Sequence, residues 1–483
     1  MNILTRIIEY VITILKFSFC FIICKSYGIF FGGLICLLTF KSKRILTEKL
    51  FNLKHLGLDK PLLGHNPAER YNIMVTLIIE DFDAQKLKTH IIENGIKNTT
   101  KLMSTLVYQF YDYYWKFEKN PTKREKMIEN TFIHTEIPSE ENLLEYCQKE
   151  VQIHVDNFNT EKFPYETHLI KFKNSTRGCF IFKCDHVLSD GMGLVAFICS
   201  LADNYSEDVF HPMMRSKKYS VWQEIFGVLL FPFYLIRSVF KIIVLNKIEK
   251  TRFKKRFDTK DCPHTGKTVF ALSSQFHLSN FEKARKSLKI SFNDMTVLVI
   301  LKSFRKHLDV STINFALPFG KTGIPKSVND VEMKNQSAGI FQSFPLIDSI
   351  EAESSKISKI LSRELKNYFN VTSSNVLFSL IVEFLPSDVL IYISDQSIEK
   401  VDLIHSNVPG PIKELFYSGC KILDILPIIS TGRIKAMLPV FSYNKKFRVA
   451  VAYDESVGLN PKDLVGTIEN ELEQIERKYN TNH

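Results

Sequence analysis

A strand, a turn and a helix follow one another around a single histidine, and this unit constrains the fold more than any other stretch. The run GCFIFKC at 178–184 is rich in bulky and aromatic residues, which is typical of a buried strand. Apolar residues then recur at helical spacing from 193 to 203. His186 therefore lies where a strand ends, and Asp190 and Gly191 lie in the turn before a helix. Such a turn would fix an imidazole at the mouth of a sheet.

The types of residue in this turn suit that task. We expect Gly191 to adopt backbone angles that a side chain would forbid. Asp190 can accept hydrogen bonds from nearby backbone N–H groups or pair with a cation. Taken alone, His-x3-Asp-Gly is a weak pattern, and a structural histidine would explain it equally well. Other motifs are needed to decide between the two interpretations.

The length and net charge of the chain limit the number of folding units and the kinds of partner it can have. A chain of 483 residues holds two core-forming units of ordinary size and an appendage. The 39 phenylalanines against 2 tryptophans indicate a core that is filled largely by phenylalanine. A formal net charge of +11 favours an anionic partner, either a phospholipid surface, a nucleic acid or a phosphorylated small molecule. We recognise no nucleic-acid-binding module, so we expect no nucleic-acid partner.

The nine cysteines are widely spread and odd in number, and no Cys-x2-Cys spacing occurs. We therefore expect buried free thiols rather than a disulfide framework, and no metal site. Cys184 and Ser189 flank the histidine, and we interpret both as structural.

The N-terminus is strongly apolar from about residue 7 to 40, and the basic residues Lys41, Lys43 and Arg44 follow. This pattern predicts a membrane anchor, either a single span over about 17–40 or a hairpin of two short helices. The basic cluster places the following domain on the cytosolic side. We expect a membrane location, at the endoplasmic reticulum.

A second apolar stretch covers about 221–245 and is followed by six basic residues between 247 and 256. We favour an interfacial amphipathic helix with a polybasic segment that contacts anionic lipid. A second transmembrane helix and a buried connector are the alternatives. The predicted organisation is an anchor at 1–45, a first unit at 46–215, a connector at 216–260 and a second unit at 261–483.

Several separated motifs resemble one known family. The stretch around His186 resembles the His-His-x3-Asp-Gly signature of the coenzyme-A-dependent acyltransferase superfamily. Four further motifs, in matching order, are similar to those of the wax ester synthase/diacylglycerol acyltransferase family within it. They are YNIMVTLIIE at 71–80, which looks like the family's first strand, ISFNDMTV from 290, which looks like its Asn-Asp helix with Asn293 and Asp294, KNQSAG at 334–339, and HSNVPGP at 405–411 with Asn407. Two departures stand out: Asp185 replaces the first histidine, and Phe163-Pro164-Tyr165 replaces Pro-Leu-Trp.

The resemblance implies an α/β fold of two chloramphenicol-acetyltransferase-like subdomains with a tunnel between them, beside the N-terminal helix or hairpin. It also implies that His186 is the general base and that Asp190 orients the turn. Asn293, Asp294 and Asn407 would line or brace the channel, although helix capping and an ordinary turn explain them as well. Asp185 would face away from the site, because neighbouring strand residues point to opposite faces.

The activity implied is transfer of a fatty acyl group from acyl-CoA to a long-chain alcohol or diacylglycerol at a phospholipid membrane. No cofactor is needed beyond acyl-CoA as co-substrate, and no covalent intermediate is required. Two alternatives are an acyltransferase for a small hydroxylated metabolite and an inactive lipid-binding relative in which Asp185 marks a decayed site.

Overall fold

The computed structural model describes residues 70–109, 112–156, 158–210, 264–319, 330–363 and 401–480, together with positions 44, 47–49, 53–56, 59, 391, 394 and 398. The predicted anchor at 1–45, apart from Arg44, and the predicted connector at 216–260 lie outside the described residues. Within the described part, no helix combines the length and the apolar character that crossing a membrane requires.

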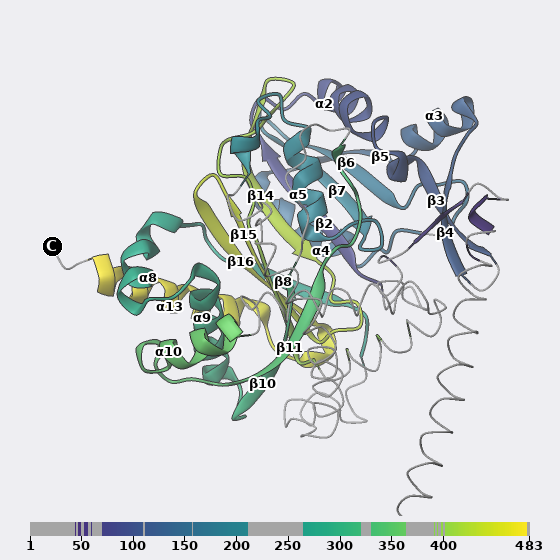
Figure 1. Cartoon of the computed structure of the whole chain (residues 1–483). Helices are drawn as coiled ribbons and strands as arrows, with labels where there is room; N and C mark the ends of the chain where they lie inside the picture. Colours follow the sequence, from purple (N-terminus) through teal and green to yellow (C-terminus); the bar gives the residue numbers. More distant parts are fainter. Residues whose placement is uncertain are drawn as a thin grey trace, which may run out of the picture.

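The first half of the chain builds most of a six-stranded sheet in the order β13-β14-β2-β7-β6-β5 (Figure 1). Its strands are β2 (Asn72–Ile79), β5 (Phe132–Ile137), β6 (Tyr165–Phe172), β7 (Gly178–Asp185), β13 (Phe416–Tyr417) and β14 (Cys420–Ile429). The helices beside it are α2 (Ala84–Ile91), α3 (Pro121–Glu129), α4 (Leu143–Glu150) and α5 (Gly191–Ser200). The predicted strands at 71–80 and 178–184 are thus confirmed as the central pair β2 and β7.

Alternating side chains on β2 explain how helices cover both faces of this sheet. Val75 and Leu77 pack in the cluster that contains α2 and α5, whereas Met74 and Ile78 pack with α4. The predicted helix at 193–203 is present as α5 and starts two residues earlier, at Gly191.

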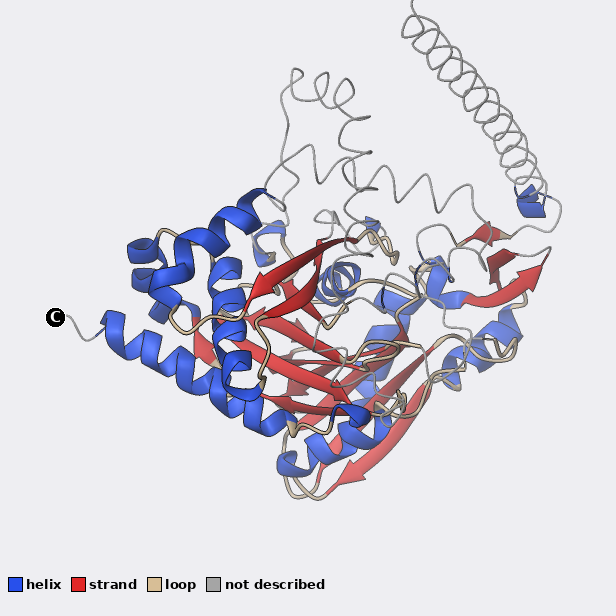
Figure 2. Cartoon of the chain, turned by 90° about the horizontal axis from the view of Figure 1, so that it is seen from below, coloured by secondary structure: helices blue, strands red, loops and turns tan. Residues whose placement is uncertain are grey.

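A second sheet of seven strands has the order β11-β10-β12-β15-β16-β8, with β9 also paired to β16. Its strands are β8 (Thr268–Leu272), β9 (Phe276–His277), β10 (Thr312–Phe319), β11 (Ala338–Pro345), β12 (Leu403–Val408), β15 (Ala436–Tyr443) and β16 (Lys446–Asp454). The helices α8 (Glu282–Leu288), α9 (Phe292–His307), α10 (Ile350–Leu361) and α13 (Pro461–Asn480) gather on one side of it (Figure 2).

The two sheets are linked by an exchange of strands. β14 belongs to the predicted second unit by sequence, yet it pairs with β2 in the first sheet, with Ile425 opposite Leu77. β15 follows it along the chain and pairs in the second sheet. The domain boundaries themselves stay a prediction, and β14 ties the two predicted units together.

A small third sheet, which the sequence did not predict, joins β1 (Lys54–His55), β3 (Ser104–Gln109) and β4 (Asp112–Phe117). Asp112 accepts hydrogen bonds from Arg44 Nε at 3.1 Å and pairs with His55 Nε2 at 2.9 Å. Short 3-10 or π turns complete the described elements: Ile92–Ile96, Thr100–Met103, Glu140–Asn142, Glu207–Val209, Leu278–Phe281 and Glu455–Val457.

The five described cysteines are buried and free, as predicted: Cys147, Cys179, Cys184, Cys199 and Cys420.

Candidate active site

His186 follows the last residue of β7 and is held there by the backbone. Its N–H donates to the carbonyl of Tyr71 at 2.7 Å. The next residues form a tight loop, in which Leu188 N donates to the carbonyl of Asp185 at 2.9 Å and Val187 N donates to the Asp185 carboxylate at 2.8 Å. These hydrogen bonds fix the backbone that carries the imidazole. The imidazole lies at the end of strand β7, as the sequence predicted.

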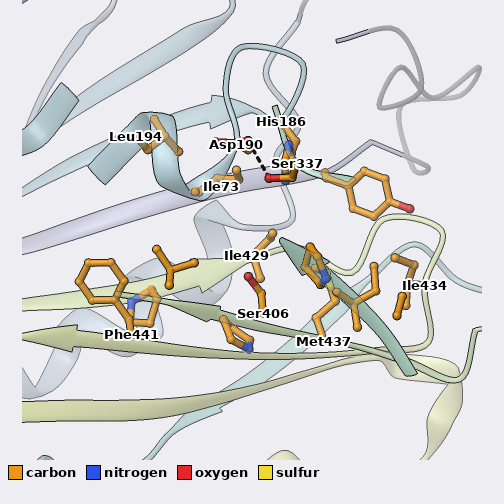
Figure 3. A pocket seen from close by; sticks show the side chains of 18 of the residues that line it. Ile73, His186, Asp190, Leu194, Ser337, Ser406, Ile429, Ile434, Met437 and Phe441 are labelled. Atoms are coloured by element: carbon orange, nitrogen blue, oxygen red, sulfur yellow. Dashed lines mark hydrogen bonds between the residues drawn. The ribbon is translucent and has the colours of Figure 1, made fainter. Parts of the chain in front are cut away.

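His186 lines a cavity of about 290 Å³ between the two large sheets. The walls come from β2, β14 and α5 on one side and from β10, β11, β12 and β15 on the other, and they are mostly apolar. On β15, Met437 and Phe441 face the cavity, whereas Leu438 and Val440 pack under the helices. Figure 3 shows His186 and Ser406 on opposite walls, with the Ser406 hydroxyl directed into the cavity.

Asp190 joins two segments at the rim of this cavity. Its Oδ1 accepts from Gly193 N at 2.8 Å and so caps helix α5. Its Oδ2 accepts from Gln336 N at 2.9 Å and from the Ser337 hydroxyl at 2.7 Å, the bond drawn in Figure 3. One carboxylate thereby fixes both the start of α5 and the segment that leads into β11.

Gly191 has a different role from the one predicted. It is the first residue of α5, and its φ angle is not positive, so no unusual backbone conformation requires glycine. A Cβ at this position would instead lie 3.2 Å from Val408 Cγ2, across the gap between the sheets. At Gly193 a Cβ would collide with the Ser189 hydroxyl. Close packing, rather than turn geometry, explains the two glycines.

Asn335 contacts the imidazole directly. Its Oδ1 lies 3.1 Å from His186 Nδ1, and its Nδ2 donates to the His186 carbonyl at 2.9 Å. Both Asn335 N and Asn335 Nδ2 donate to Asp59 Oδ1, at 3.0 and 2.9 Å. The sequence motif KNQSAG contained this residue, but the pattern alone gave no reason to connect it with His186.

Asp59 in turn is paired with Lys101. Lys101 Nζ lies 2.7 Å from Asp59 Oδ2 and donates to the carbonyl of Leu188 at 2.6 Å, in the loop that follows His186. Trp115 Nε1 donates to the same carboxylate oxygen at 3.2 Å. Burial lowers the pKa of Lys101, and Asp59 opposes this shift. No sequence pattern pointed to this pair, because Asp59 and Lys101 are far apart along the chain.

The electrostatics favour a neutral imidazole. Burial is the main cause that lowers the pKa of His186 below its ordinary value, and the His186 carbonyl, Asp190 and Asn335 oppose it. At neutral pH the ring is therefore unprotonated on one nitrogen, as a general base must be.

Asn293, Asp294 and Asn407, the residues predicted from the second half of the chain, support α9 and β12 and do not line the cavity. Ser291, not Asn293 or Asp294, is the N-cap of α9, and Asp294 completes a capping box with it. The Asp294 carboxylate also accepts from the Ser358 hydroxyl at 2.9 Å. Asn407 Nδ2 donates to Asn293 Oδ1 at 3.3 Å, which links β12 to α9. Asn293, Asp294 and Asn407 are not among the residues that line the cavity.

Comparison with known proteins supports the motif resemblance. Residues 340–476 match the family model described as the WS/DGAT C-terminal domain. The fold matches the wax ester synthase/diacylglycerol acyltransferase from Marinobacter aquaeolei VT8 with a TM-score of 0.57, over 88% of this chain and 100% of that one, at 15% identity. Residues 340–476 therefore form a C-terminal domain of the wax ester synthase/diacylglycerol acyltransferase (WS/DGAT) type, and the chain shares the fold of the Marinobacter enzyme.

Two further solved structures share the mixed α/β fold of this chain. The trichothecene 15-O-acetyltransferase from Fusarium sporotrichioides matches with a TM-score of 0.56 and 11% identity, over 85% of this chain and 93% of that one. The starter condensation domain of rhizomide synthetase, solved with C8-CoA, matches with a TM-score of 0.51 and 9% identity, over 90% and 92%. No curated protein gave a significant match.

Asp185, the main departure from the WS/DGAT signature, is buried and is not among the residues that line the cavity. Its carboxylate accepts from Val187 N within the loop that carries His186. The residue thus supports the loop rather than entering the site, in line with its expected direction on the strand.

Proposed function

We propose that this WS/DGAT-family acyltransferase moves a fatty acyl group from acyl-CoA to a long-chain alcohol or diacylglycerol, giving a wax ester or a triacylglycerol. The observation that carries the proposal is the position of the His186 imidazole in the wall of an apolar cavity between the two sheets. An apolar cavity suits a hydrocarbon chain, because burying such a chain there removes it from water.

In the proposed reaction, the unprotonated nitrogen of His186 takes the proton of the alcohol while its oxygen attacks the thioester carbon. The bond from carbon to the alcohol oxygen forms, the bond to sulfur breaks, and the proton leaves with the CoA thiol. The thioester oxygen gains charge during the attack. We assign its stabilisation to the Ser406 hydroxyl, which faces into the cavity from the opposite wall.

The surroundings proposed for the enzyme follow from the sequence. The net charge of +11 suits phospholipid headgroups and the phosphates of CoA, and the apolar N-terminus suits an anchor in the endoplasmic reticulum membrane with the acyltransferase unit in the cytosol. We propose no cofactor besides acyl-CoA. The largely apolar walls favour a lipid acceptor over a small hydroxylated metabolite, and the position of Asp185 outside the cavity argues against a decayed site.

The experiment is an ester-forming assay with labelled acyl-CoA and either a fatty alcohol or diacylglycerol. His186→Ala should lower turnover by about 10²–10⁴-fold, the usual contribution of a general base, with acyl-CoA binding unchanged. His134→Ala, at an exposed position on β5, is the matched control and should keep wild-type turnover. The mechanism falls if His186→Ala retains a tenth or more of that turnover.

A further inference from the structure

The orientation of the Asn335 amide can be deduced from its neighbours. Its Nδ2 lies within hydrogen-bond distance of three oxygens: Asp59 Oδ1 at 2.9 Å, the His186 carbonyl at 2.9 Å and the Val187 carbonyl at 3.3 Å. Carbonyl and carboxylate oxygens only accept hydrogen bonds, so the amide nitrogen must face them. The flipped amide would place its oxygen against all three. The Asn335 oxygen therefore faces the imidazole.

This orientation decides which nitrogen of His186 carries the proton. Asn335 Oδ1 lies 3.1 Å from Nδ1 and can only accept, so Nδ1 must donate an N–H to it. In the neutral ring, Nε2 is then left with its lone pair available to a substrate.

Asp59 and Lys101 hold the amide in this orientation. Asp59 is buried and accepts from both the backbone and the side-chain nitrogen of Asn335. Lys101 balances the charge of Asp59 and donates to the carbonyls of Val187 and Leu188, two neighbouring residues of the loop that follows His186. The three residues from His186 to Leu188 are thus tied to Asn335 and Lys101 through their own carbonyls.

We propose that Asn335 and Asp59 are positioning residues that fix the Nδ1–H tautomer of His186 and so present Nε2 as the base. Asp59 precedes the first strand of the large sheets, so the segment that follows the predicted anchor contributes to the site. Their importance for catalysis rests on the proposed function, whereas the tautomer is a property of the folded protein alone. An imidazole free of these contacts favours the Nε2–H tautomer, which cannot act as a base through Nε2.

The test is ¹⁵N NMR of the full chain with ring-labelled histidine, above the pKa of His186. The His186 signals are assigned by their loss in His186→Ala. In the wild type, Nδ1 should show the shift of a protonated nitrogen and Nε2 that of an unprotonated one. Asn335→Leu, which removes the amide and keeps the volume, should move both shifts toward the opposite tautomer. It should also lower kcat by about tenfold or more with little change in KM for acyl-CoA.

Asp59→Asn is the second variant, since it keeps an acceptor for Asn335 and removes the charge that pairs with Lys101. We expect it to show a mixture of the two tautomers and a smaller loss of kcat. Asp424→Asn removes another buried carboxylate, the one paired with Arg448 at 2.7 Å, and should leave the His186 shifts unchanged.

The inference is overturned if the wild-type ring carries its proton on Nε2, or if Asn335→Leu and Asp59→Asn both keep the wild-type shifts. It is also overturned if the shifts move but kcat of both variants equals that of the wild type. Wild-type protein that makes no ester, yet shows the predicted shifts in all variants, would refute the proposed function and leave the assigned tautomer standing.

Discussion

The Asp190 carboxylate holds two separate segments with three hydrogen bonds, one to Gly193 N and two to Gln336 N and the Ser337 hydroxyl. A side chain with one oxygen and one nitrogen cannot replace both functions. In Asp190→Asn the oxygen can still cap α5, but the amide nitrogen then meets the N–H of Gln336, and two donors cannot bond each other.

We therefore predict that Asp190→Asn lowers the free energy of unfolding by about 1–3 kcal/mol, the cost of leaving buried donors without an acceptor. Ester formation should fall as well, because Ser337 and Asn335 lose their anchor near His186. Thermal unfolding and the ester assay measure the two effects. Asp83→Asn, at the exposed N-cap of α2, is the matched control and should change neither by much. Unchanged stability of Asp190→Asn would contradict this account.

At this scale the sequence predicted what lies close together along the chain. His186 and Asp190 are four residues apart, so a strand and a helix on either side were enough to place them. Asn335, Asp59 and Lys101 reach the same loop from three distant segments. Only tertiary packing brings them together, so single-sequence patterns could not assign their roles. Gly191 was identified as special for the wrong reason, because its constraint comes from Val408, more than two hundred residues away.

Among the elements, β12 contributes a buried histidine to the packing between the second sheet and α9. His405 Nδ1 donates to the Leu438 carbonyl on β15 at 3.0 Å, and its Nε2 lies 3.2 Å from the Thr296 hydroxyl on α9. Burial lowers the pKa of His405 to about 4, and the bond to Leu438 opposes this shift. The neutral ring can hydrogen-bond to both Leu438 and Thr296, so His405 gains a proton only when the chain unfolds.

This arrangement predicts a loss of stability in acid. Between the ordinary histidine pKa of about 6.5 and the folded value of about 4, the unfolded chain binds more protons than the folded chain, so the free energy of unfolding falls as the pH falls. The contribution of His405 over this window is about 3 kcal/mol. Denaturant unfolding of the wild type and of His405→Phe, from pH 7.5 to about 4.5, measures it.

The Phe variant should show a shallower dependence on pH, because its ring has no proton to gain. In the variant the Thr296 hydroxyl can direct its one proton to the Asn293 carbonyl, 2.9 Å away, so it is not left without an acceptor. If the free energy of unfolding depends on pH equally in the wild type and in His405→Phe, His405 does not change its protonation on unfolding.

The periodic and capped elements were the predictable ones. The strand at 178–184 and the helix that follows His186 were predicted from local patterns, and the strand at 71–80 from the family resemblance. All three formed, with boundaries shifted by one to three residues. The helix that begins near Asn293 was also expected, although its cap is Ser291. In the third sheet, β1 has only two residues, too few for a periodic signal, and it pairs with β4, a segment about sixty residues further along the chain.

For the whole molecule, the decisive feature is the cavity between the two large sheets. The mixed α/β fold was expected from the motif order. The pairing of β14 with β2 in the first sheet was not expected. Strand order depends on pairing between distant segments, which local sequence patterns do not reveal. This crossing matters for the site, since β14 and β15 supply opposite walls of the cavity.

The structure offers a way to narrow this cavity without disturbing the fold. Gly339 on β11 lines the cavity and is exposed, and a Cβ added there would meet no heavy atom within 4 Å. Its φ angle is not positive, so a side chain causes no backbone strain. Gly339→Leu should therefore place an isobutyl group in space that the proposed substrates would use, with the melting temperature unchanged.

If the acyl chain or the lipid alcohol occupies the cavity, Gly339→Leu should lower kcat/KM for long-chain substrates by about tenfold, and less for short acyl chains, because a filled pocket excludes the extra methylenes. A series of acyl-CoA lengths in the ester assay measures this difference. Gly466→Leu on α13 is the matched control, because its added Cβ also meets no heavy atom within 4 Å and the position is remote from the cavity lining. Equal loss at every chain length, or equal loss in both variants, would mean that the lipid substrates bind elsewhere on the molecule.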